Sequence, residues 1–157
     1  MKLFIEPLDK EMAINILNWK YEKPYDFYNN DMNDEDLQEM LDGTYKAVVD
    51  VENALIGFFC VGRSAQVPAG KSIGAYTDEF VDMGLGMHPN LVGQGNGYEF
   101  CRSIIGFIEE HYENTPIRLT VATFNKRAIR LYEKLGFVAK HQFNTDRAQF
   151  ETMIRKF

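Results

Sequence analysis

The apolar pattern of the first sixty residues predicts three short strands and two helices. In the first predicted helix, Met12, Ile16 and Trp19 recur at helical spacing, and an acid-rich stretch interleaved with aromatic residues follows it. Alternating or continuous apolar runs bounded by turn residues predict the strands. The predicted elements are a strand (Leu3–Ile5), a helix (Leu8–Trp19), a helix capped by Asn33 or Asp34 and ending near Leu41, and two strands (Thr44–Val51, Leu55–Val61).

The second half of the chain has a stronger pattern. Gly93, Gly95 and Gly97 precede a helix whose apolar residues share one face, and Gly136 stands where a helix C-terminal glycine is expected. The predicted elements are a polar loop (63–78), a strand (Glu79–Met87), a helix after Gly97 with Cys101, Ile104, Ile105, Ile108 and Tyr112 on one face, a strand (Ile117–Val121), a helix capped by Asn125, and two strands (Phe137–Phe143, Phe150–Ile154). This order predicts a mixed α/β (α+β) domain.

Composition adds two constraints to this picture. The 157 residues contain 45% hydrophobic types and carry a net charge of −6, which is ordinary for one globular domain and excludes collagen, low-complexity disorder and a disulfide-stapled miniprotein. The charge is uneven, because residues 1–60 are net −8 and residues 61–157 are net +2, with six basic side chains between Arg118 and Lys140. We therefore expect no nucleic-acid partner, but a compact polyanion fits the C-terminal half.

Cysteines, histidines and hydropathy predict the setting of the protein. Cys60 and Cys101 lie among apolar residues, which favours buried thiols over a disulfide. The three histidines are far apart and do not pair with cysteines at a metal-ligand spacing, so we expect no metal. No segment approaches the ~20 apolar residues of a membrane span. We expect a cytoplasmic protein without membrane partners, as a monomer or homodimer.

The segment between Met87 and Gly97 is the first candidate binding site. Its glycines alternate where a strand leads into a helix, so their amides could cradle a phosphate at the positive helix end, although a simple flexible turn explains the same glycines. A dinucleotide fingerprint fails on spacing because the third glycine comes one residue early. Ala65–Ser72 resembles a Walker A loop, but Gly74 follows where a long helix should begin.

The loop VGQGNG (Val92–Gly97) and the downstream segment NKRAIRLYEKLGF (Asn125–Phe137) together resemble the GNAT superfamily of acyl-CoA N-acyltransferases. The resemblance covers Glu79 to about Phe143. It implies a single-domain GNAT-like fold over residues 1–157, with a central mixed, mostly antiparallel twisted sheet of six to seven strands flanked by about four helices. It also implies an acceptor-side part (1–60) and an acetyl-CoA-binding core (79–143).

The resemblance also assigns residues to the cofactor, which is acetyl-CoA as co-substrate. The loop amides would take the coenzyme A diphosphate, the preceding strand would pair with the pantetheine arm, and basic residues of the last helix (Lys126 and Lys134 among them) would meet the nucleotide phosphates. The implied cofactor-binding residues are Leu85, Gly86, Met87, Val92, Gly93, Gln94, Gly95, Asn96, Gly97, Asn125, Arg127 and Arg130.

For the chemistry, the family pattern identifies Tyr132 as the general acid that protonates the departing thiolate. The sequence departs from the pattern at two points. Val92 replaces the Arg or Gln that usually begins the loop, and Thr120 stands where many members carry a glutamate base. Asp82 and Glu79, near the strand before the loop, are the alternative candidates for general base, and a water chain is a third option.

The resemblance implies an N-acetyltransferase that transfers the acetyl group to a primary amine by direct attack. The acceptor, a small molecule or a protein, would meet residues 19–42, where eight acids accompany Lys20 and Lys23. We expect a cationic acceptor near Tyr21, Tyr25 and Tyr28, although a solvated acidic face explains the same residues. Two alternatives stay open: a non-catalytic acyl-CoA-binding regulatory domain of the same fold, and a nucleotide-triphosphate-binding protein that uses Ala65–Ser72.

Overall fold

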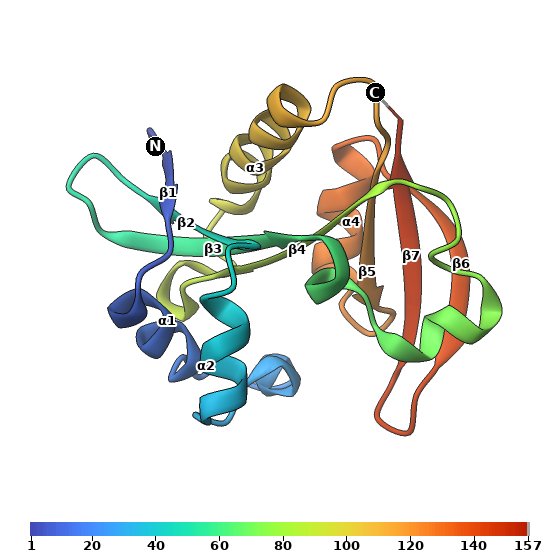
Figure 1. Ribbon diagram of the computed structural model, residues 1–157, viewed down its shortest axis with the longest axis horizontal. Helices are drawn as coiled ribbons and strands as arrows, with labels where there is room; N and C mark the ends of the chain where they lie inside the picture. Colours follow the sequence, from blue (N-terminus) through green and yellow to red (C-terminus); the bar gives the residue numbers. More distant parts are fainter. Residues whose placement is uncertain (157) are drawn as a thin grey trace. The chain divides into compact units, whose positions relative to one another are not determined.

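A computed structural model describes residues 1–156 of the chain, and within them seven strands hydrogen-bond in one mixed sheet. The strand order is β1-β2-β3-β4-β5-β7-β6. The pairs β1–β2, β2–β3, β5–β7 and β6–β7 are antiparallel, whereas β4–β5 is parallel. Four α-helices accompany the sheet (Figure 1). The predicted sheet of six to seven strands and the predicted number of helices are confirmed.

The described chain divides into two compact units, each assembled from two separate segments. Among the described residues, unit 1 contains Met1–Cys60 and Leu85–Ile104, and unit 2 contains Val61–Gly84 and Ile105–Lys156. The expectation of a single domain over the whole chain stays a prediction.

Unit 1 holds the acid-rich segment and the glycine loop. Two side-chain caps set its first helices, because Asp9 accepts a hydrogen bond from the Met12 amide and Asn33 accepts one from the Asp36 amide, each at 2.8 Å. Its elements are β1 (Phe4–Pro7), α1 (Lys10–Leu17), the 3-10 helix η1 (Tyr25–Tyr28), α2 (Asp34–Met40), β2 (Tyr45–Val49), β3 (Leu55–Val61), the end of β4 (Val81–Met87), η4 (Pro89–Leu91) and the start of α3 (Gly97–His111).

Helices α1 and α2 pack together beside β2 and β3 (Figure 1). Their buried core contains Ala13, Ile16, Leu17, Leu37 and Met40, and Trp19 and Phe58 are half-buried against it. Two glycines allow close packing, one on each face of the sheet, because Gly57 and Phe58 are successive residues of β3 and point to opposite faces. A Cβ at Gly57 would lie 2.5 Å from the Phe100 ring of α3, and a Cβ at Gly86 would lie 2.5 Å from the Phe58 ring. Aromatic rings therefore cover both glycines closely, which requires the absence of side chains there.

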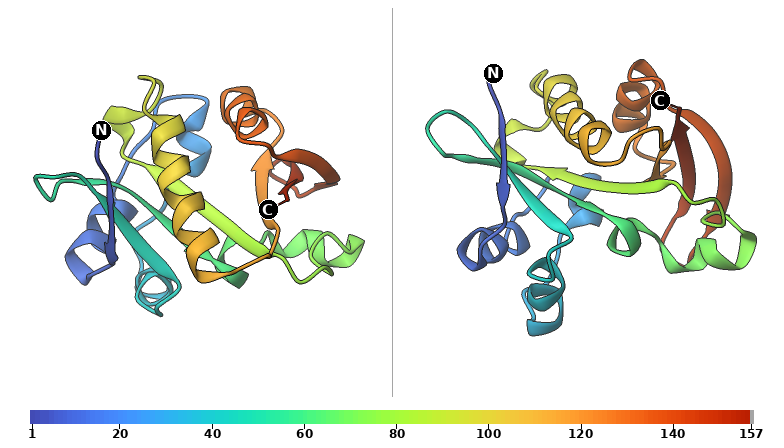
Figure 2. Two further views of the ribbon diagram at one scale, coloured as in Figure 1. Left: turned by 90° about the horizontal axis from the view of Figure 1, so that it is seen from above. Right: turned by 45° about the horizontal axis from the view of Figure 1, so that its top comes forward.

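Unit 2 holds the C-terminal strands and the second motif. Asn125 caps α4 by accepting a hydrogen bond from the Ala128 amide at 3.1 Å, and Gly136 after the helix has φ of 95°. Figure 2 shows α4 beside β5. The elements of unit 2 are η2 (Gly62–Ala65), η3 (Pro68–Ile73), the start of β4, the end of α3, β5 (Ile117–Ala122), α4 (Lys126–Lys134), β6 (Val138–Asn144) and β7 (Gln149–Arg155).

The structure also refines several predicted boundaries. The first helix is shorter than predicted, because Asn18 ends it, and β4 begins at Val81 rather than Glu79. The predicted polar loop (63–78) contains two 3-10 helices and not the long helix that a Walker A site needs, and Gly70 within it lies under the rings of Tyr76 and Phe143. Cys60 and Cys101 are buried thiols that form no disulfide, as predicted.

Candidate functional site

The loop between β4 and α3 is built to present backbone amides. Gly93 and Gly95 have φ of 75° and 84°, a left-handed conformation that side-chain-bearing residues rarely adopt. The side-chain amide of Gln94 donates a hydrogen bond to the Asn90 carbonyl at 2.8 Å and so braces the turn. Among the described residues, the backbone N–H groups from Gly93 to Glu99 donate no intramolecular hydrogen bond. They are available to an anion at the start of a fifteen-residue helix, where the helix dipole is positive.

The strand that leads into this loop has an open edge. The pairing of β4 with β5 runs from Val81–Ile117 to Met83–Leu119 and ends there. The His88 amide donates to the Ile56 carbonyl of β3 at 2.8 Å. Because successive residues of a strand direct their backbone groups to opposite sides, Leu85 and Met87 face away from β3. The Leu85 amide and carbonyl are thus placed to pair with an extended ligand such as a pantetheine arm.

The Met87 carbonyl on the same edge already has a partner within unit 1. It accepts a hydrogen bond of 2.8 Å from the hydroxyl of Tyr21, one of the predicted acceptor-side residues. Burial raises the pKa of Tyr21 to about 12, so its side chain stays a neutral phenol near neutral pH. The fold thereby brings one predicted acceptor residue to the predicted cofactor strand. Tyr25 and Tyr28 lie in η1, where Phe27 and Tyr28 contact edge to face at 5.2 Å.

Two further aromatic residues lie near the end of β4: Trp19, which falls in the predicted acceptor region (residues 19–42) without being singled out, and His88, which was not predicted as a site residue. The Trp19 ring lies 5.1 Å from the His88 ring, with the planes inclined by 57°, and 6.2 Å from the Phe58 ring. The sequence pattern places Trp19 in the apolar stripe of a helix and His88 among isolated histidines. Trp19 and His88 lie 69 positions apart in the chain, so the sequence alone does not predict that their rings are in contact.

In unit 2, the second motif forms the predicted capped helix. Tyr132 of α4 is buried, with 9% of its surface exposed, and packs edge to face on Phe137 at 5.9 Å. Asn125 uses one side of its amide as the helix cap, and Arg127 and Arg130 are exposed on α4. Tyr132 and Asn125 belong to unit 2, and the glycine loop belongs to unit 1. Their assignment to one cofactor therefore remains a proposal.

The candidates for general base have different environments. Asp82 is 4% exposed, and its two carboxylate oxygens accept hydrogen bonds of 2.6 and 2.8 Å from the guanidinium of Arg118. The Gln66 amide donates a third, of 2.8 Å. Glu79 is exposed in the irregular segment before β4. The Thr120 hydroxyl contacts the Tyr76 hydroxyl at 2.8 Å, so this position holds two hydroxyls in place of a carboxylate.

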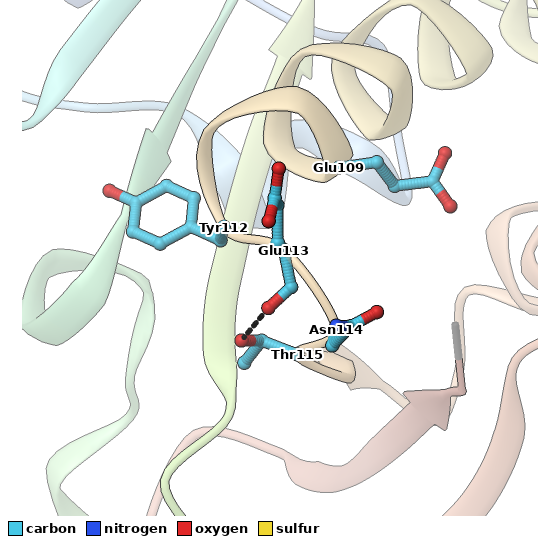
Figure 3. Close-up of a pocket in the computed structure, with 5 residues that line it drawn as sticks. All are labelled: Glu109, Tyr112, Glu113, Asn114 and Thr115. Carbon is cyan, nitrogen blue, oxygen red and sulfur yellow. Dashed lines mark hydrogen bonds between the residues drawn. The ribbon is translucent and has the colours of Figure 1, made fainter.

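A separate surface hollow of about 220 Å³ lies at the end of α3 (Figure 3). Its lining residues are Glu109, Tyr112, Glu113, Asn114 and Thr115, and none of them is a predicted site residue. Glu109 is engaged in an ion pair of 2.9 Å with Arg155. Within residues 1–156, no three His, Cys, Asp or Glu side chains converge as a metal cluster, and no helix has the length and apolar character of a membrane span.

Comparison with known proteins agrees with the loop and helix geometry. The model of the acetyltransferase (GNAT) family matches residues 11–137. Among solved structures, a chimera of the spermidine N-acetyltransferase SpeG from Vibrio cholerae with hSSAT has a TM-score of 0.71 at 20% identity and covers 99% of this chain and 96% of its own.

Other solved structures share the fold at similar identity. Mutant forms of the spermidine/spermine N-acetyltransferase SpeG from Vibrio cholerae have a TM-score of 0.67 at 19% identity, over 99% of this chain and 95% of that chain. A GNAT-family acetyltransferase from Bacillus anthracis has a TM-score of 0.73 at 13% identity, with the same two coverages. No curated protein sequence matches the chain. Because the family model spans most of its length, the chain belongs to the GNAT acetyltransferase family.

Proposed function

We propose that this protein transfers the acetyl group of acetyl-CoA to a primary amine of a cationic small molecule or protein. The glycine loop carries the proposal, because its free amides at the start of α3 suit a diphosphate without any help from charged side chains. The amides also explain why Val92 is tolerated at the start of the loop. The open edge of β4 at Leu85 suits the amide groups of the pantetheine arm.

The proposed reaction is direct transfer. The reacting ammonium first loses one proton to solvent, and the lone pair of the free amine then attacks the thioester carbonyl carbon. The carbon–nitrogen bond forms, the attached nitrogen loses its second proton to water, and the carbon–sulfur bond breaks. A β4 amide stabilises the developing oxyanion. Tyr132 gives its phenolic proton to the departing thiolate and regains one from water. We assign Asp82 a structural role, because a carboxylate held by Arg118 and Gln66 has little freedom to accept a proton from the acceptor.

Two observations support a cationic acceptor. Glu22, Asp26 and Asp31 are exposed on the segment that folds back to the end of β4, and the eight acids of residues 19–42 outnumber its two lysines. The resulting negative field attracts cations. The SpeG structures that share the fold belong to enzymes described as spermidine N-acetyltransferases, which adds weight to an alkyl polyamine.

Calorimetry with acetyl-CoA and a thiol-release assay over a panel of amines test the proposal together. We expect saturable acetyl-CoA binding and amine-dependent release of the free thiol. Diamines and polyamines should be turned over faster than monoamines whose far end carries no charge. ATP serves as the control ligand and should not bind. Tight acetyl-CoA binding without turnover of any amine would instead indicate a non-catalytic acyl-CoA-binding domain.

A further inference from the structure

Three aromatic side chains surround the end of β4 in unit 1. The Tyr21 hydroxyl is anchored on the Met87 carbonyl at 2.8 Å, and the next residue, His88, faces the Trp19 ring at 5.1 Å. The planes of Trp19 and His88 are inclined by 57°, so the two rings form a wedge instead of a closed stack. All three side chains are half-buried, and each keeps part of its surface in contact with solvent.

The hydrogen bonds of His88 define which form of its ring is present. Its Nδ1 accepts a hydrogen bond from the Asn90 amide at 3.1 Å, so the neutral imidazole carries its proton on Nε2. In that tautomer Nε2 has no lone pair to offer, and His88 is therefore not a general base through this atom. What His88 presents is a ring beside Trp19, held in place by the turn that begins the glycine loop.

The surroundings of this wedge favour a cation. An ammonium group is attracted to the faces of Trp and Tyr rings within about 6 Å of their centroids. The Tyr21 hydroxyl donates its hydrogen to the Met87 carbonyl, so the role left to its oxygen is that of an acceptor for ammonium N–H groups. The exposed acids of the same segment add long-range attraction. The wedge also adjoins Leu85–Met87, the strand edge proposed to hold the acyl arm.

We propose that Trp19, Tyr21 and His88 form a subsite for the second, non-reacting ammonium group of an alkyl diamine or polyamine acceptor. This inference rests on the proposed function, since it places one end of the acceptor beside the strand where the other end reacts. The subsite selects for a second positive charge, whereas the reacting amine is common to every acceptor.

Matched amines isolate the second charge. Diaminobutane and butylamine, or diaminohexane and hexylamine, share the reacting amine and the methylene chain and differ only at the far end. The measured quantity is the ratio of kcat/KM for the diamine to kcat/KM for the monoamine. A merely structural defect lowers both values together and leaves this ratio unchanged.

Two variants remove one ring each. In Trp19→Leu the apolar contact with Phe58 is largely kept and the aromatic face is lost, and Trp19→Phe should restore most of the effect. In His88→Asn the side-chain oxygen can still accept from the Asn90 amide, because asparagine is a good helix N-cap, while the ring is lost. Tyr112→Leu is the control, since Tyr112 is an exposed ring outside the subsite.

We expect the diamine-to-monoamine ratio to fall by roughly 2- to 30-fold in Trp19→Leu, the range of a cation–π contact from exposed to desolvated surroundings. His88→Asn should lower it in the same direction, and Tyr112→Leu should not change it. Acetyl-CoA affinity should be unchanged in all three. An unchanged ratio in both Trp19→Leu and His88→Asn, or an equal loss for both amines, would overturn the subsite.

Binding is measured independently of turnover, because Trp19 is the single tryptophan of the chain. Titration of the wild-type protein with diaminohexane in the presence of coenzyme A should change its intrinsic fluorescence saturably, and hexylamine should do so much more weakly. Such a response without turnover of any amine would support the subsite and refute the proposed function. Turnover of amines with equal fluorescence responses to the two ligands would refute the subsite alone.

Discussion

The buried ion pair of unit 2 leads to a prediction that separates a structural carboxylate from a catalytic one. Arg118 and Asp82 have side chains only 3% and 5% exposed and are joined by two hydrogen bonds. The guanidinium also donates to the Asp78 carbonyl at 3.2 Å and lies 5.1 Å from the Tyr76 ring centroid and 5.5 Å from that of Phe80. Removing the charge of Asp82 therefore leaves a buried cation without its counter-ion.

Breaking a buried pair in this way costs about 3–5 kcal/mol, a large part of the ~5–15 kcal/mol that stabilises a typical domain. For Asp82→Asn, with a urea m-value of about 2 kcal/mol/M, the unfolding midpoint should fall by about 2 M. The double variant Asp82→Leu/Arg118→Met replaces both charges with apolar groups and should recover at least half of this loss. Urea unfolding followed by circular dichroism measures both midpoints.

Activity of the same variants decides the role of Asp82. If Asp82 is structural, the folded double variant should keep kcat within about threefold of wild type, measured well below its melting temperature. A general base contributes about 10²- to 10⁴-fold to rate. A loss of that size in the double variant, together with restored stability, would refute the structural role and identify Asp82 as the base.

Further predictions concern the acid, the loop, the acceptor and the alkaline limit. Tyr132→Phe should lower kcat by about 10²-fold or more with little change in acetyl-CoA affinity measured by calorimetry; an unaltered rate removes it as the acid. Gly95→Val should weaken acetyl-CoA binding, because φ is 84° there, whereas Gly43→Val, at φ of 98° in a distant turn, should strain the backbone without that loss. Neutralising Glu22, Asp26 and Asp31 should raise KM for diamines and weaken its dependence on salt; an unchanged KM would contradict the steering field. Burial raises the pKa of Tyr21 from 10.0 to about 12, so the unfolded phenol ionises first, and the free energy of unfolding should fall by ~1.4 kcal/mol per pH unit between these values. In the Tyr21→Phe variant, the free energy of unfolding measured with urea should not show this fall between pH 10 and pH 12.

Local patterns were sufficient to predict most elements. Asn125 as a cap, Gly136 after α4 and the glycines before α3 act within a few residues of themselves, so their effects are visible in the sequence. The 3-10 helices of residues 62–73 were not predicted, because their packing depends on distant partners such as Phe143 above Gly70. The place of Asp82 in the strand before the loop makes it a candidate general base. The same place gives no indication of its ion pair with Arg118, which lies 36 positions away in the chain.

The sequence by itself determined the family motifs, the order of elements and the uneven charge, since each depends on residue type and short-range spacing. Only the tertiary structure decided which side chains meet. It joined Tyr21 to Met87 across 66 positions, placed Trp19 against His88, and enclosed Asp82 with Arg118 and Gln66. Side-chain contacts between distant segments depend on how the strands register and the helices pack, and those are properties of the whole chain.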